Sequence, residues 1–224
     1  LCWCGSQQCE VSGNHQVDVG QFLLIGPYPQ DRTCVSGRPC FMKAVPGLHL
    51  QAQDRMLVLD TCGTASPVLG FPVLSVLTAK TNASEVQEVQ GFVAGSFLEF
   101  VTSSGGHYSL CWCAASVFRC TLAEEFQAHA GSLTVIGPRF GIGESRICVA
   151  GRVCVLDNLL GQNLQPNDAV MLLDTCGLPG SAAEAIPLSN AASNLTSVWT
   201  AAGGTYRLCW CASSLSSCIS SEDF

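Results

Sequence analysis

Cysteine is the residue of this sequence best placed to do chemistry, and it is abundant. The 224 residues include 15 cysteines, which could be metal ligands, nucleophiles or disulfide partners. Three pairs have the form Cys-Trp-Cys, at residues 2–4, 111–113 and 209–211. Two cysteines one residue apart rarely chelate one tetrahedral zinc ion, and the histidines do not recur at equivalent places. We therefore expect disulfide bonds formed in an oxidising compartment, with no metal site and no catalytic thiol.

The cysteines belong to a tandem repeat with a period of about 100 to 110 residues. After each Cys-Trp-Cys comes a further cysteine, and the motifs Ile-Gly-Pro, Cys-x5-Cys and Leu-Asp-Thr-Cys-Gly then follow in the same order in both copies. A period of this length is typical of domain-sized units. The predicted division is the end of a preceding unit at 1–6, repeat 1 at 7–116, repeat 2 at 117–214 and the start of a third unit at 215–224.

The order of the cysteines predicts seven disulfide bonds. The second cysteine of each Cys-Trp-Cys would bond the next cysteine, each Cys-x5-Cys would close on itself, and the Asp-Thr-Cys-Gly cysteine would bond the next Cys-Trp-Cys. The predicted pairs are Cys4–Cys9, Cys34–Cys40, Cys62–Cys111, Cys113–Cys120, Cys148–Cys154, Cys176–Cys209 and Cys211–Cys218. Swapping the two cysteines within each Cys-Trp-Cys gives a second scheme, because both point to the same strand face. Cys2 is left over, with its expected partner in a preceding unit.

The segments between the cysteines predict an all-β fold, because short runs of Val, Leu, Ile and Phe alternate with Gly, Pro, Asn and Asp. Expected strands are 21–25, 55–60, 71–77, 97–102, 108–113, 132–136, 169–174, 197–201 and 206–211. Single helical turns are expected at 85–90 and 182–185.

Units of about 100 residues with a disulfide beside a tryptophan predict tandem, disulfide-stapled β-sandwiches of the immunoglobulin-like class. The Cys-Trp-Cys strand would close its domain, with Cys111 facing inward and Trp112 facing the opposite side. The junction at 114–119 contains neither Gly nor Pro. We therefore expect a stiff connection and a rod-like array.

Several classes of function are disfavoured by composition. The formal net charge is −7, charged residues make up 12% of the chain, and no run of basic residues occurs, which argues against binding to nucleic acid. The most apolar stretch is too short to span a membrane. No catalytic or cofactor-binding motif is apparent, so we expect a protein that is not an enzyme and needs no cofactor.

Candidate modification and ligand sites are few. Asn82 and Asn194 begin sequons for N-glycosylation. Asp54 and Asp168 match between the copies, as do Asp60 and Asp174; they could bind calcium, but the scarcity of nearby carboxylates favours aspartates that bond backbone amides in turns. Tyr28, Phe140 and Trp199 could be exposed aromatic contacts for glycans or proteins, although ordinary packing is favoured.

The combined pattern, Gly-x-Tyr-x-Leu-Cys-Trp-Cys-Ala followed by Ile-Gly-Pro, Cys-x2-Gly-x2-Cys and Leu-Asp-Thr-Cys-Gly, resembles repeats in very large proteins of alveolate protists. It is most similar to the cysteine repeat modular proteins of apicomplexans. The resemblance covers essentially the whole chain. It implies large secreted or membrane-anchored surface proteins linked to attachment or regulated exocytosis.

The predicted function is an extracellular structural or adhesive repeat module, a stiff spacer or assembly segment of a larger surface or filamentous protein. The expected partners are further repeats of the same chain, with protein or glycan partners at the cell surface. The alternatives are a carbohydrate- or ligand-binding module, and an accessory segment of a secreted enzyme.

Overall fold

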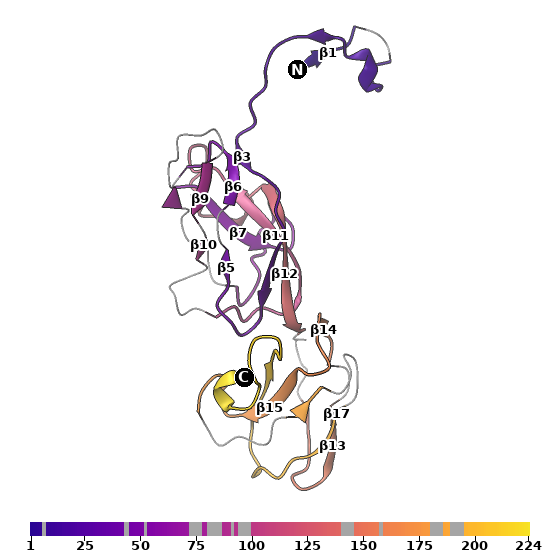
Figure 1. Ribbon diagram of the computed structural model, residues 1–224, viewed down its shortest axis with the longest axis vertical. Helices are drawn as coiled ribbons and strands as arrows, with labels where there is room; N and C mark the ends of the chain where they lie inside the picture. The colour runs from indigo at the N-terminus through magenta and orange to yellow at the C-terminus, as the bar shows by residue number, and fades with distance from the viewer. Residues whose placement is uncertain are drawn as a thin grey trace.

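The computed structural model in Figure 1 describes residues 1–5, 8–42, 45–51, 53–71, 78–79, 87–90, 92–93, 100–139, 146–156, 159–179, 186–188 and 195–224. These residues form short strands joined by turns and 3₁₀ helices, with no α-helix among them. The predicted all-β class is therefore confirmed for this part of the chain.

The first half of the chain holds the elements up to the second Cys-Trp-Cys strand. They are β1 (Cys2–Trp3), η1 (Ser12–Asn14), β2 (Val17–Asp18), β3 (Gly26–Pro27), β4 (Arg32–Val35), β5 (Phe41–Met42), β6 (Val45–Leu48), β7 (Arg55–Leu59), β8 (Thr78–Ala79), β9 (Gln87–Gln90), β10 (Phe92–Val93) and β11 (Gly106–Cys113).

The second half repeats this pattern in part. It holds η2 (Ala123–Glu125), β12 (Ala128–Pro138), β13 (Val153–Leu156), β14 (Gly161–Gln162), β15 (Ala169–Leu173), β16 (Ile186–Pro187), β17 (Leu195–Val198), β18 (Arg207–Cys211) and η3 (Ser221–Asp223).

Two sheets contribute side chains to the core of the first repeat. In one, β11 lies between β7 and β12, both antiparallel to it, and β4 pairs with the far side of β12 in parallel. In the other, the order is β3-β6-β9-β8. The buried cluster between them draws side chains from both, including Val45 of β6, Val58 of β7 and Leu110 of β11. Alternate residues of each strand point inward, as the period of a β-strand requires.

The tryptophan of the Cys-Trp-Cys strand belongs to this core. Trp112 is only 7% exposed and packs in the cluster between the sheets. Cys111 and Cys113 face the other side of β11, where they form a separate buried cluster with Cys120 and Phe126. The predicted orientation of Cys111 and Trp112 was therefore wrong. Both faces of this strand are buried: the indole lies in the larger cluster, and the disulfides lie in the smaller cluster on the other face.

The Cys-Trp-Cys strand does not close the first sheet, because the long strand β12 follows it there. β12 lies beyond residue 116, where the first repeat was expected to end, yet residues 128–135 pair with β11 and residues 133–136 pair with β4. Only its last two residues, Gly137 and Pro138, pair with β14 of the second repeat. One continuous strand therefore pairs with residues of both repeats, and in Figure 1 it runs from the middle of the molecule toward the lower part.

The second repeat has a smaller described sheet. β15 lies between β16 and β18, and β13 pairs with β17. β18 is the counterpart of β11, and β15 is the counterpart of β7. Among the described residues β18 pairs with β15 only.

Most expected strands that can be compared are present. β7, β11, β12, β15, β17 and β18 overlap the segments predicted at 55–60, 108–113, 132–136, 169–174, 197–201 and 206–211. Residues 21–25 do not form a strand, and residues 87–90, expected within a helical turn, form β9, so both predictions were wrong. Residues 72–77, 97–99 and 182–185 lie outside the described part of the chain.

Candidate functional site

The cysteines form seven disulfide bonds in the structure. The pairs are Cys4–Cys9, Cys34–Cys40, Cys62–Cys111, Cys113–Cys120, Cys148–Cys154, Cys176–Cys209 and Cys211–Cys218. These are the pairs of the first predicted scheme, with Cα–Cα distances of 5.4 to 5.8 Å. Cys2 is exposed and lies outside these pairs.

The disulfides after each Cys-Trp-Cys hold the connecting segment against the sheet. Cys113–Cys120 folds residues 114–126 over the outer face of β11, where Phe126 is buried. The guanidinium of Arg55 donates a hydrogen bond to the carbonyl of Cys120 (3.2 Å), and the amide of Gly63 donates one to the carbonyl of Phe126 (2.9 Å). The segment that joins the repeats is therefore packed along the first repeat.

The matched aspartates Asp54 and Asp168 are buried and accept hydrogen bonds from backbone amides. Asp54 accepts from the amides of Gln51 (2.9 Å) and Ala115 (3.0 Å). Asp168 accepts from the amides of Gln165 (2.9 Å) and Ser213 (3.0 Å) and from the Ser213 hydroxyl (3.1 Å). Each carboxylate thus joins its own turn to the segment after the Cys-Trp-Cys strand.

The calcium hypothesis gains no support from this geometry. No group of three or more His, Cys, Asp or Glu residues suited to a metal ion occurs among the described residues. Asp60 and Asp174 are exposed at the ends of their strands. The oxygens of Asp54 and Asp168 already accept backbone hydrogen bonds, which is the role of an aspartate that fixes a turn.

Two half-buried acidic residues, Glu125 and Asp223, close short helical turns. Glu125 accepts hydrogen bonds from the amides of Leu122 (3.0 Å) and Thr121 (2.6 Å), and these bonds lower the pKa of its carboxyl. In the second repeat, the amides of Ser220 and Ile219 lower the pKa of Asp223 in the same way. The reason is that a hydrogen bond to the ionised form favours that form.

A β-bulge fits β12 between its two neighbours. The register between β11 and β12 shifts at Leu110/Cys111, opposite Ala130 and Gly131. Gly131 has φ +128°, and a Cβ atom built there would lie 1.7 Å from the carbonyl oxygen of Gln30. The bulge changes which residues point inward, so that Ala130, Leu133 and Val135 all enter the core. Only glycine fits this close approach of two backbones.

A second contact fixes the start of β4 beside β12. Asp31 accepts hydrogen bonds from the amide and the hydroxyl of Ser132, and the hydroxyl bond is the largest cause of a lowered pKa at Asp31. The two residues are 101 positions apart in the chain. This hydrogen-bonded contact, together with the pairing of β12 with β11 and β4, holds β12 in the first repeat.

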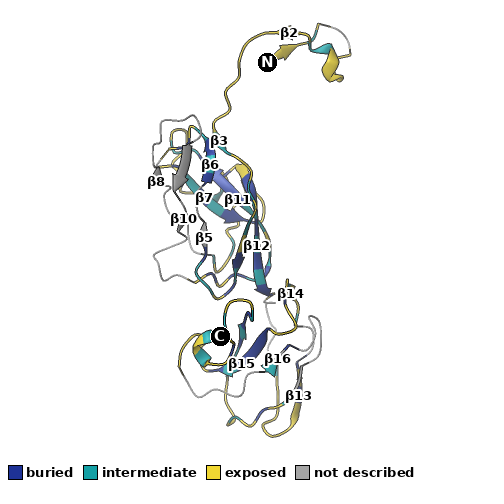
Figure 2. Ribbon diagram, in the orientation of Figure 1, coloured by how far each residue is buried: buried dark blue, intermediate teal, exposed yellow. Residues whose placement is uncertain are grey.

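Residues 17–27 are the counterpart of β12 in the first copy, and only their two ends, β2 and β3, are paired with other strands. The sequence Val-Asp-Val-Gly-Gln-Phe-Leu-Leu-Ile-Gly-Pro aligns without a gap with Ala-His-Ala-Gly-Ser-Leu-Thr-Val-Ile-Gly-Pro at 128–138. β2 pairs with β1 in the register that β12 has with β11, Cys2 opposite Asp18 as Cys111 is opposite His129. Figure 2 shows the chain after β2 as an exposed segment that runs to the first repeat without a neighbouring strand.

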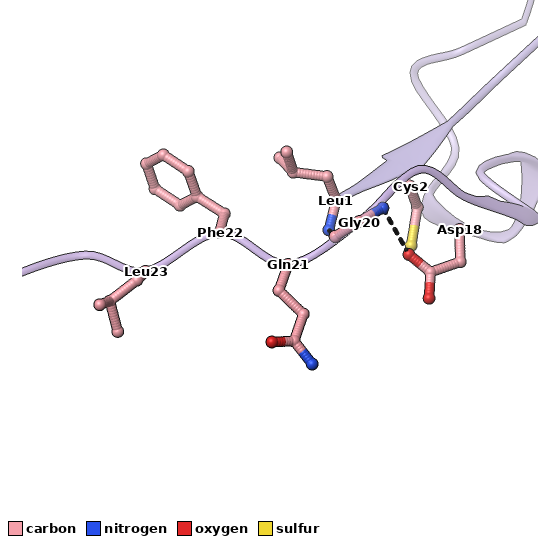
Figure 3. A pocket seen from close by; sticks show the side chains of 7 residues that line it. All are labelled: Leu1, Cys2, Asp18, Gly20, Gln21, Phe22 and Leu23. Carbon is pink, nitrogen blue, oxygen red and sulfur yellow. Dashed lines mark hydrogen bonds between the residues drawn. The ribbon is translucent and has the colours of Figure 1, made fainter.

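An open hollow of about 510 Å³ lies along this segment, lined in part by Leu1, Gln21, Phe22 and Leu23. Figure 3 shows Phe22 pointing to one side of the extended backbone and Gln21 and Leu23 to the other. The amide of Gly20 donates a hydrogen bond to the carboxylate of Asp18 (2.9 Å). The alternation is that of a β-strand, although no second strand lies beside residues 21–25 in the described structure.

The remaining predicted sites have mixed outcomes. Trp199 is buried in the core of the second repeat, so it packs internally, whereas Tyr28 is exposed. Phe140, Asn82 and Asn194 lie outside the described residues. No helix in the described ranges is long and apolar enough to cross a membrane.

The chain resembles one curated protein in sequence. It is 25% identical over 168 residues to cysteine repeat modular protein B of Toxoplasma gondii, a match that covers 63% of this chain and 2% of that protein. No family model matches the chain, and no solved structure matches it. Together with the disulfides, this similarity supports a cysteine-rich, repeat-like protein.

The sequence motifs missed the most distinctive feature of the site, the pairing of β12 with the preceding repeat. A signal for it was present in the gap-free match between residues 17–27 and 128–138, which continues from the cysteine segment into the Ile-Gly-Pro motif without a break.

Proposed function

We propose that this chain is an extracellular structural module, a stiff spacer or assembly segment within a larger surface or filamentous protein. The observation that carries the proposal is the shared strand β12, which pairs with β11 and β4 of the first repeat and with β14 of the second. Ile136 pairs with β4 and the next residue, Gly137, pairs with β14. No unpaired linker residue therefore separates the two sets of strands, so rotation of one repeat against the other would break these pairs.

The proposed location is the secretory pathway or the cell surface. Seven disulfides in 224 residues favour an oxidising compartment. The similarity to a cysteine repeat modular protein supports the same location. Asn82 and Asn194 stay proposed glycosylation sites in that setting.

The immunoglobulin-like sandwich and the predicted domain boundaries are also part of this proposal. A core that draws side chains from β6 of one sheet and from β7, β11 and β12 of the other supports a two-layer unit. We propose a role without catalysis, since the cysteines, apart from Cys2, are held in disulfide bonds.

Small-angle scattering of the monomeric chain tests the stiffness. The expected result is a single, well-defined distance distribution that matches the two repeats in fixed orientation. A matched variant with Gly-Ser-Gly inserted between Ile136 and Gly137 separates the halves of β12 and should broaden that distribution. A wild-type distribution as broad as that of the insertion variant would contradict a stiff spacer.

A further inference from the structure

The loop closed by the disulfide Cys34–Cys40 lies where the two repeats meet, and it contacts the second repeat away from β12. We infer that this loop is an orientation clamp: Arg38 binds the turn η3 on the second repeat and so fixes the twist of that repeat about β12. The inference rests on the proposed spacer function and names a contact, besides the shared strand, that keeps the repeats in one orientation.

The pairing of β12 with β14 restrains the second repeat along one line only. It consists of two register pairs, with one further backbone hydrogen bond beside them. Large rotations would break these bonds, but the twist between paired strands varies over roughly −10 to −35° without loss of pairing. A contact to the side of the β12 axis is therefore needed to fix the twist of the second repeat.

Arg38 makes a contact of this kind. Its guanidinium donates a hydrogen bond to the main-chain carbonyl of Asp223 (3.3 Å), 185 positions further along the chain. Asp223 is the last residue of η3, where a carbonyl has no partner within the helical turn and a positive side chain is favoured. Hydrogen bonds from the amides of Ser220 and Ile219 lower the pKa of the Asp223 carboxyl most, and the charge of Arg38 lowers it further.

The turn that receives Arg38 is packed firmly on the second repeat. Phe224, which follows η3, is buried in a cluster with Met171 of β15 and with Cys211 and Cys218. The disulfide between these two cysteines holds the segment that leads into the turn. In Figure 1 the turn is the yellow coil beside the C-terminus. Restraining η3 therefore restrains the sheet of the second repeat.

The first repeat presents Arg38 from a well-bonded turn. Gly37 has φ +78°, and its amide donates a hydrogen bond to the carbonyl of Val101 (2.6 Å). The amide of Arg38 donates one to the carbonyl of Val35 (3.2 Å), which closes the turn. The backbone that carries the guanidinium is thus fixed to the first repeat, so the contact with η3 joins two held elements.

Ser36 holds the same loop against the point where β12 passes from one repeat to the other. Its amide donates a hydrogen bond to the carbonyl of Ile136 (2.8 Å), and its hydroxyl donates one to the carbonyl of Ser103 (2.9 Å). A Cβ atom built at Gly137 would lie 2.8 Å from the Cβ atom of Ser36 and 3.5 Å from the ring of Trp210. The loop of the first repeat and the Cys-Trp-Cys strand of the second therefore meet at this glycine.

The second copy of the loop has the same backbone bonds in different surroundings. The amides of Gly151 and Arg152 donate hydrogen bonds to the carbonyls of Trp199 (2.8 Å) and Val149 (3.0 Å), as the matching amides do in the first copy. Arg152 is exposed in this chain, whereas Arg38 is half-buried. Arg152 therefore offers a control of the same residue type in the same kind of disulfide-closed loop.

Residual dipolar couplings of the full chain test the inference, because they report the orientation of each repeat in a common frame. A short Gly-Ser extension after Phe224 keeps the terminal carboxylate away from Arg38. Both repeats of the parent chain should fit one alignment tensor. Arg38→Gln should lose the shared tensor, while the couplings within each repeat still fit the structure of that repeat. Arg152→Gln should keep the tensor of the parent chain.

NMR titration of Asp223 checks the contact itself. Arg38→Gln should raise the pKa of the Asp223 carboxyl, because a nearby positive charge is removed. Arg152→Gln should leave that pKa unchanged. Arg38→Lys retains the charge without the planar guanidinium, so the pKa of Asp223 should stay closer to its value in the parent chain than in Arg38→Gln.

The outcomes separate the clamp from the spacer. A shared tensor in Arg38→Gln, equal effects of Arg38→Gln and Arg152→Gln on orientation, or an unchanged pKa of Asp223 in Arg38→Gln would overturn the clamp. A parent chain with one tensor would still support the stiff spacer in each of these cases, with β12 alone holding the repeats. Two unrelated tensors in the parent chain would contradict both the spacer and the clamp.

Discussion

At the scale of single residues, the structure places its polar chemistry in turns. Asp54 and Asp168 are completely enclosed, and their carboxylate oxygens bond the amides of two separate chain segments. A buried carboxylate is tolerated only when it is well bonded. These aspartates therefore maintain the contact between a turn and the segment after the Cys-Trp-Cys strand.

Replacing Asp54 by alanine should lower the free energy of unfolding by about 2–3 kcal/mol, because the amides of Gln51 and Ala115 lose their acceptor inside the protein. Asp60→Ala is the matched control at an exposed position and should change it by less than about 0.5 kcal/mol. Urea denaturation monitored by tryptophan fluorescence measures both. Equal effects of the two substitutions would show that burial of Asp54 contributes nothing.

Glu125 should make the stability of the η2 turn depend on pH. Its folded pKa lies below 4.5, its ordinary value, because the amides of Leu122 and Thr121 bond the ionised carboxylate. A lowered pKa means that the stabilisation is fully present above the unfolded pKa and is lost as the pH falls through the folded pKa.

Glu125→Gln should therefore remove this part of the loss of stability at low pH. Glu124→Gln, at the exposed neighbouring carboxyl, should leave that pH dependence unchanged. NMR titration of the Glu125 carboxyl measures the pKa directly. A midpoint at or above 4.5 would contradict the assigned hydrogen bonds.

At the scale of elements, the bulged strand β12 decides how the repeats join. Its glycine at 131 allows β4 to approach, and the register shift there directs Leu133 and Val135 into the core of the first repeat. The counterpart at Gly20 has the same backbone angle without the neighbour. Substitutions at the two glycines can therefore distinguish the cost of strain at positive φ from the cost of the collision with β4.

Gly131→Ala should lower the free energy of unfolding by at least about 3 kcal/mol, because strain at positive φ is added to a collision with the Gln30 backbone. Gly20→Ala should cost about 1 kcal/mol or less, since residues 21–25 are unpaired and can adjust. Thermal unfolding of both variants, followed by circular dichroism, gives the comparison. Similar losses at the two positions would show that β4 does not approach β12 closely.

The sequence predicted those elements whose evidence is local. The order and spacing of the cysteines left two disulfide schemes, of which the structure has the first, and β7, β11, β15 and β18 follow from short apolar runs beside turn residues. The orientation of Trp112 could not be predicted in this way, because both faces of β11 are buried. Strand alternation does not say which face contacts the larger buried cluster.

The strand at 21–25 and the course of β12 show a second limit. Residues 17–27 and 128–138 have matching patterns, yet residues 19–25 lie in no sheet, whereas 128–138 form one continuous strand. Residues 128–138 form a strand because β11 and β4 lie on either side of them, and these strands come from distant parts of the chain. Local β-propensity therefore cannot distinguish the two segments.

At the scale of the whole molecule, the repeats overlap. The first repeat is completed by β12, which follows its own Cys-Trp-Cys strand, and the last two residues of β12 pair with β14 of the second repeat. A tandem array built in this way would interlock each unit with the next through a strand and a disulfide-held segment. This arrangement supports the proposed stiff spacer.

Hydrogen–deuterium exchange by mass spectrometry tests this overlap most directly, on the monomeric chain at low concentration. The amides of residues 132–136 should exchange as slowly as those of β11, because they are held between two strands, while the amides of 21–25 should exchange at rates close to those of an unfolded peptide. Fast exchange at 132–136, or equal protection of the two segments, would contradict the claim that β12 is an integral strand of the preceding repeat.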